Sequence, residues 1–99
     1  MKLQDQLVRV LVVDDQPVVL AAIARQLADA GFGVSVAKSA KEALAMLDHG
    51  DPAVHVVLTD VVMPELDGHT LGRLIGERHP RIPVLYMSGH ADEVVREGL

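Results

Sequence analysis

The sequence predicts an α/β fold, in which buried strands alternate with amphipathic helices along a chain of 99 residues. Three short runs are almost wholly apolar, which is typical of parallel strands that are covered on both faces. Between these runs, apolar residues recur at the spacing that places them on one face of a helix. Because the two patterns alternate, we expect one parallel sheet whose strands are joined by right-handed crossovers.

Four strands are expected. The strongly apolar runs cover residues 8–13 and 54–59, together with the run that begins at Ile82 and ends at Met87. A fourth run, residues 32–36, is weaker and alternates between apolar and polar side chains, so we expect it at an edge of the sheet.

The first two helices have recognisable ends. The first is expected from Pro17 to Ala30, because proline suits the first position of a helix. The second is expected after Ser39, since Glu42 follows at the spacing of a capping box, and Gly50 can end it in a left-handed conformation.

Two more helices complete the pattern. The third is expected over residues 68–78, which lie ahead of Pro80, because a residue that precedes proline disfavours the helical conformation. The fourth is short and is expected over residues 91–97.

Composition limits the function. Hydrophobic residues make up 49% of the chain, so we expect residues 1–99 to form a single globular domain and not a disordered segment. The net charge is −5 and the basic residues are scattered, which argues against direct binding of nucleic acid. There is no cysteine and no apolar stretch long enough to cross a membrane, so we expect a cytoplasmic protein without thiolate chemistry.

Polar side chains follow three of the predicted strands. Asp14 and Asp15 follow the first strand, Asp60 follows the third, and Ser88 follows the fourth. In an open parallel sheet the carboxyl ends of the strands meet at one edge, so these side chains should lie together. Carboxylates about 4 Å apart repel one another by about 4 kcal/mol at an effective dielectric of about 20, so the cluster needs a proton or a cation.

Magnesium suits this cluster, because Mg²⁺ binds a few carboxylate oxygens and keeps positions for water or phosphate oxygens. Asp60 could then act as a nucleophile that forms an acyl phosphate, and Ser88 could donate a hydrogen bond to a phosphoryl oxygen. Taken singly, the residues have simpler interpretations. Asp14 or Asp15 could cap the first helix, and Asp67 with Gly68 has the composition of a turn.

Three motifs resemble a known family. They are Val-Asp-Asp-Gln-Pro at residues 13–17, Leu-Thr-Asp-Val-Val-Met-Pro-Glu-Leu-Asp-Gly at residues 58–68 and Tyr-Met-Ser-Gly at residues 86–89. Together they are similar to the receiver domain of response regulators in two-component phosphorelay signalling. The resemblance implies a flavodoxin-like, doubly wound parallel sheet with strand order 2-1-3-4.

The resemblance also implies roles for single residues. Asp60 corresponds to the phosphoacceptor, and Asp14 and Asp15 correspond to the acidic pair that holds Mg²⁺. The backbone carbonyl of Val62 corresponds to a further metal ligand, and Ser88 corresponds to the hydroxyl residue that moves towards the phosphoryl group. The expected partner is a histidine kinase or a histidine phosphotransfer protein.

The end of the chain departs from the family pattern. Family members continue into a fifth strand that carries a lysine and then a fifth helix, whereas this sequence ends at Leu99, so we expect a shortened receiver. Its last residues are weakly similar to receivers of hybrid sensor kinases. The strand from Ile82 to Met87 would then have an uncovered edge, through which we expect self-association.

The expected function is therefore that of a phosphoacceptor signalling domain and not of a turnover enzyme. Two alternatives stay open. One is an interaction module that has lost phosphorylation. The other is a phosphatase of the haloacid dehalogenase type, although such an enzyme needs a second aspartate where this chain has Val62.

Overall fold

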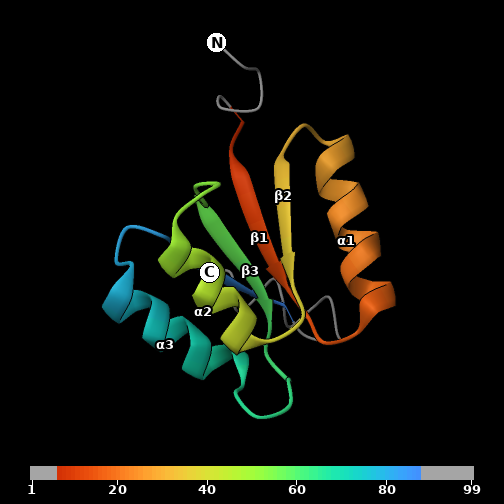
Figure 1. Cartoon of the computed structure of the whole chain (residues 1–99). Helices are drawn as coiled ribbons and strands as arrows, with labels where there is room; N and C mark the ends of the chain where they lie inside the picture. Colours follow the sequence, from red (N-terminus) through yellow and green to blue (C-terminus); the bar gives the residue numbers. More distant parts are fainter. Residues whose placement is uncertain (1–6, 88–99) are drawn as a thin grey trace.

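The computed structural model describes residues 7–87 and contains a parallel sheet flanked by helices (Figure 1). Its elements follow one another as β1 (Arg9–Val13), α1 (Pro17–Asp29), β2 (Gly33–Ala37), α2 (Ala40–His49), β3 (Val56–Asp60), α3 (Gly68–Arg78) and β4 (Val84–Met87). The predicted alternation of strands and helices is confirmed over this range. The helix expected over residues 91–97 lies outside the described residues.

The sheet has the order β2-β1-β3-β4, and every neighbouring pair of strands is parallel. This is the order that the family resemblance implies, and it confirms that β2 lies at an edge. β1 and β2 begin one residue later than predicted, and β3 and β4 begin two residues later. β3 begins at Val56; just before it, the His55 backbone N–H donates to the Arg9 carbonyl at 2.9 Å, and the His55 ring accepts from the Arg9 N–H at 2.9 Å. β4 begins at Val84, after Pro83, which has no N–H to donate.

The core has two layers, one on each face of the sheet. Alternate residues of β1 point to opposite faces, so Leu11 and Val13 join the layer under α2 and α3, whereas Val10 and Val12 pack against Leu20 of α1. Figure 1 shows α1 beside β2, with α2 and α3 together on the other side of the sheet. The two layers hold the carboxyl end of β1 in place.

Side-chain caps fix where two helices begin. The Ser39 hydroxyl accepts a hydrogen bond from the Glu42 N–H at 3.1 Å, as the sequence predicts for α2. Asp67 caps α3 by accepting from the Thr70 N–H at 2.7 Å, so the residue that we expected in a turn also starts a helix. Neither Asp14 nor Asp15 caps α1, whose N-cap is Gln16 without a side-chain hydrogen bond.

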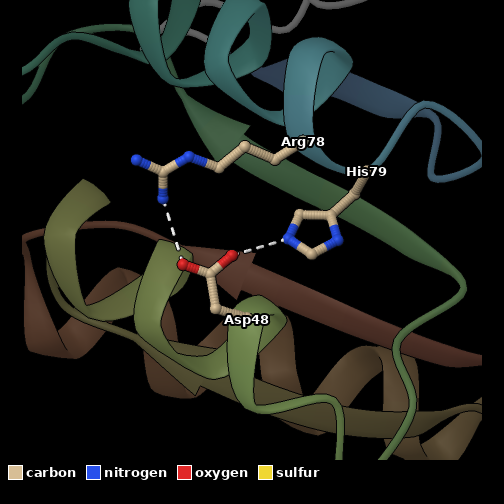
Figure 2. Close-up of polar contacts among 3 residues, drawn as sticks. All are labelled: Asp48, Arg78 and His79. Atoms are coloured by element: carbon tan, nitrogen blue, oxygen red, sulfur yellow. Dashed lines mark hydrogen bonds and ion pairs between the residues drawn. The ribbon is translucent and has the colours of Figure 1, made fainter.

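A polar cluster joins the carboxyl ends of α2 and α3 (Figure 2). The carboxylate of Asp48 accepts from the Arg78 guanidinium at 3.0 Å and lies 2.8 Å from Nε2 of His79. The two basic side chains also lie where the negative end of the α3 dipole favours positive charge. This cluster therefore links the two helices at the end opposite to the predicted acidic site.

No helix within residues 7–87 is both long and apolar enough to span a membrane.

Candidate functional site

Three carboxylates meet at the carboxyl edge of the sheet. Asp14 and Asp15 directly follow β1, and Asp60 is the last residue of β3. The two strands pair in parallel up to Val13 and Thr59, so the residues after these positions emerge side by side. One carboxylate oxygen from each aspartate lies within 4.8 Å of the others. The structure thus brings together the three acidic residues that the sequence singles out.

Asp14 is the most enclosed of the three, with 4% of its surface exposed. Its backbone N–H donates to the Ala37 carbonyl at 3.2 Å, and its Oδ1 accepts from the Gln16 N–H at 2.9 Å. Burial raises the pKa of the Asp14 carboxyl, and the nearby charges of Asp60 and Asp15 raise it further, against the opposing effect of the Gln16 hydrogen bond. Asp14 is therefore a carboxylate whose ionised form is costly unless a cation lies close by.

The cost of ionising Asp14 leads to a prediction for the stability of the Asp14→Asn variant in the absence of metal. A folded-state pKa raised above the ordinary 3.8 means that the native protein binds the proton more tightly than the unfolded chain does. The penalty is absent below about pH 3.8 and grows as the pH rises through the folded-state pKa. Asparagine keeps the acceptor for Gln16 and removes the charge, so we expect a higher free energy of unfolding at pH 7.

Denaturant unfolding in EDTA measures this difference. The gain at pH 7 should exceed that of a substitution at an exposed carboxylate, and it should shrink as the pH approaches 4. Asp29→Asn is the matched control, because Asp29 is an exposed carboxylate on α1, 4.0 Å from Arg25. Equal effects of the two substitutions, or a loss of stability in Asp14→Asn, would contradict the account.

Asp60 is held by the loop that follows it. Its Oδ1 accepts from the Val62 N–H at 3.3 Å, and its backbone carbonyl accepts from the buried Thr59 hydroxyl at 3.0 Å. The Val61 N–H donates to the Met87 carbonyl at 3.1 Å, which ties this loop to the end of β4. The carboxylate of Asp60 itself stays half-buried at the edge of the sheet.

The start of α3 lies directly against Asp60. The Gly68 N–H donates to the Val61 carbonyl at 2.8 Å. A Cβ atom on Gly68 would lie 2.2 Å from the backbone oxygen of Asp60, so only glycine fits this approach. The sequence predicted a turn at Asp67 and Gly68 and a helix from residue 68, but not this contact, because the contact depends on how the helix returns to the strand that precedes it.

The donor set of the cluster fits a hard divalent cation. Three carboxylate oxygens are the type of ligand that Mg²⁺ prefers, and a bound cation would offset both the mutual repulsion and the burial of Asp14. Among residues 7–87, Asp14, Asp15 and Asp60 form the one group of three acidic or histidine side chains that lie close enough together to hold a metal ion.

The predicted roles of two site residues stay untested. Ser88 lies outside the described residues. Val62 does lie beside Asp60, with a side chain that is 78% exposed, and the role of its carbonyl as a metal ligand stays a prediction. Self-association through the strand from Ile82 to Met87 likewise stays a prediction.

Comparison with known proteins gives a consistent result. Residues 10–99 match the family model of the response regulator receiver domain. The sensor kinase CckA of Brucella abortus is 38% identical over 90 residues, which are 91% of this chain and 10% of that protein. The transcriptional regulator NtrC of Salmonella typhimurium is 39% identical over 83 residues, or 84% of this chain and 17% of that protein. The chain thus spans less than a fifth of these relatives.

Solved structures share the fold. A response regulator receiver domain protein from Clostridium thermocellum has a TM-score of 0.80 and 32% identity, and the match covers 93% of this chain and 77% of that one. A response regulator receiver protein from Sinorhizobium medicae has a TM-score of 0.77 and 34% identity, covering 95% of this chain and 77% of that one.

Proposed function

Since this chain belongs to the response regulator receiver domain family, we propose that it takes a phosphoryl group from a phosphohistidine onto Asp60 and relays the signal by a change of conformation. The observation that carries the proposal is the clustering of Asp14, Asp15 and Asp60 within 4.8 Å at the carboxyl edge of a parallel sheet. One of these carboxylates ends a strand and is half-buried, which leaves it open to an incoming phosphorus atom.

Mg²⁺ is the cation that we propose for this site. Asp14, Asp15 and Asp60 would hold it, together with the backbone carbonyl of Val62. When bound, Mg²⁺ neutralises negative charge on the transferring phosphoryl group. We further propose that the Ser88 hydroxyl donates to a phosphoryl oxygen.

The transfer itself needs little from the protein beyond position and charge. A carboxylate oxygen of Asp60 forms the new bond to phosphorus, and the bond from phosphorus to the donor nitrogen breaks. The imidazole of the donor keeps the electron pair. The Val62 N–H, which donates to Oδ1 of Asp60, helps to fix the orientation of the attacking group. The product is an acyl phosphate on Asp60.

The proposed partner is a histidine kinase or a histidine phosphotransfer protein in the cytoplasm. Support comes from the family and from a relative that is named as a sensor kinase. Phosphatase chemistry of the haloacid dehalogenase type gains no such support, because Val62 stands where the second aspartate would act. A receiver domain alone does not determine the output of the signal.

A transfer assay with a small donor tests the proposal without knowledge of the partner. The protein is incubated with acetyl phosphate, either with Mg²⁺ or with EDTA, and its intact mass is measured. We expect an increase by one phosphoryl group in the Mg²⁺ sample only, and its removal by hydroxylamine, which cleaves acyl phosphates. Unmodified protein in both samples, or an adduct that resists hydroxylamine, would overturn the proposal.

A further inference from the structure

A lysine, Lys38, lies at the same edge of the sheet as the acidic cluster. Lys38 directly follows Ala37, the last residue of β2. The Ala37 carbonyl accepts from the backbone N–H of Asp14 at 3.2 Å, and Val13 pairs with Ala37 in the sheet. The backbone therefore places Lys38 beside the strand end that carries Asp14 and Asp15.

Lys38 lines a hollow together with one of these aspartates. The loops that follow β1, β2 and β3 form this hollow of about 140 Å³, and its walls are Asp15, Lys38, Ser39, Met63, Pro64 and Glu65. Asp15 belongs both to the hollow and to the acidic cluster, so the two sites adjoin. Lys38 is exposed, and the three ion pairs found within residues 7–87 do not involve it.

The net charge of the site indicates what a lysine at this position could do. Three ionised carboxylates carry three negative charges, of which one divalent cation neutralises two. A phosphodonor that arrives as a dianion would therefore still meet a negative site. A positive side chain within about 8–10 Å acts inside the screening length at physiological salt and reduces this repulsion. Clefts whose charge is opposite to that of the ligand raise its local concentration and its on-rate by a factor of about 10–10³.

We propose that Lys38 attracts dianionic acyl phosphates to the hollow beside Asp15 and so speeds the phosphorylation of Asp60. This inference rests on the proposed function. In the step that it serves, a carboxylate oxygen of Asp60 forms a bond to phosphorus and the bond between phosphorus and the acyl oxygen breaks. Acetate leaves with the electron pair when acetyl phosphate is the donor. The total charge is unchanged and no proton moves.

Two matched variants test the role of Lys38. Lys38→Gln removes the charge from the hollow, whereas Lys41→Gln removes the same charge from the exposed first turn of α2. With acetyl phosphate and Mg²⁺ at low salt, we expect Lys38→Gln to slow adduct formation by about threefold to tenfold and Lys41→Gln by less than about twofold. The difference should shrink at 0.5 M salt, and Lys38→Arg should keep the rate within about twofold. Equal rates for the two glutamine variants would overturn the inference.

Mg²⁺ affinity provides a second readout that needs no phosphorylation. A lysine beside Asp15 repels the cation, so Lys38→Gln should bind Mg²⁺ more tightly than Lys41→Gln does, by about twofold or more, in a titration followed by amide chemical shifts. A general disruption of the site would weaken both binding and transfer. Wild-type protein that takes up no phosphoryl group refutes the proposed function, whereas normal labelling with indistinguishable affinities and rates in the two variants refutes the role of Lys38 alone.

Discussion

Asp60→Asn is expected to abolish phosphoryl uptake while leaving the fold intact. The amide oxygen of asparagine can still accept from the Val62 N–H, which lies 3.3 Å from Oδ1 of Asp60 in the wild-type protein. An amide is a far weaker nucleophile than a carboxylate, and the substitution also removes one of the three negative charges that we propose hold the cation. We expect labelling by acetyl phosphate to fall by at least about 10²-fold, since removal of a single transition-state contact alone costs about 10²–10³.

Asp67→Asn is the matched control for this experiment. Asp67 ends the loop that follows Asp60, and asparagine caps a helix about as well as aspartate does. This variant should be labelled like the wild type, and circular dichroism should show that both variants are folded. Residual fast labelling of Asp60→Asn would mean that another residue accepts the phosphoryl group.

Gly68→Ala should give the second large effect, on stability and transfer together. The new Cβ would lie 2.2 Å from the Asp60 carbonyl oxygen, whereas real Cβ contacts stay above 3.0 Å, so α3 or the end of β3 must move by about 0.8 Å. Overpacking of this kind costs about 1–3 kcal/mol. Displacement of a reacting group by about 1 Å can cost about 10²-fold in rate.

Gly76→Ala separates this contact from the general effect of alanine in a helix. Gly76 lies in α3 as well, and a Cβ atom there would meet nothing within 4 Å. Alanine at this exposed position should raise the free energy of unfolding by about 0.5–1 kcal/mol and leave labelling unchanged. If Gly68→Ala behaved like Gly76→Ala in urea unfolding and in labelling, the close approach of α3 to Asp60 would not matter.

Much of the fold follows from local patterns. The capping box at Ser39 and the residues around Gly68 and Arg78 define helix ends through short-range hydrogen bonds, and the structure confirms both helices. The limits of the strands depend on partners that are distant in sequence. At the start of β3, for example, the His55 ring accepts from the Arg9 N–H, a side-chain contact just outside the paired residues of β1 and β3. No local pattern in residues 54–59 reveals this contact.

The candidate site, too, has features that the sequence predicts and features that depend on the tertiary fold. The clustering of Asp14, Asp15 and Asp60 could be predicted because parallel strands share one carboxyl edge. The order of the strands came from the family resemblance, since periodicity alone does not determine which strands are neighbours. The hollow at Lys38 was not predicted, because it forms between the loops that follow β1, β2 and β3. Its walls are assembled only by the tertiary fold.

The most direct measurement is the location of the phosphoryl group in the wild-type protein. After reaction with acetyl phosphate and Mg²⁺, borohydride reduction converts a phosphorylated aspartate into homoserine, which peptide mass spectrometry can locate. We predict homoserine at position 60 and unmodified aspartate at positions 14, 15 and 67. Modification at any other residue, or none in protein that retains its fold, would contradict the assignment of Asp60 as the phosphoacceptor.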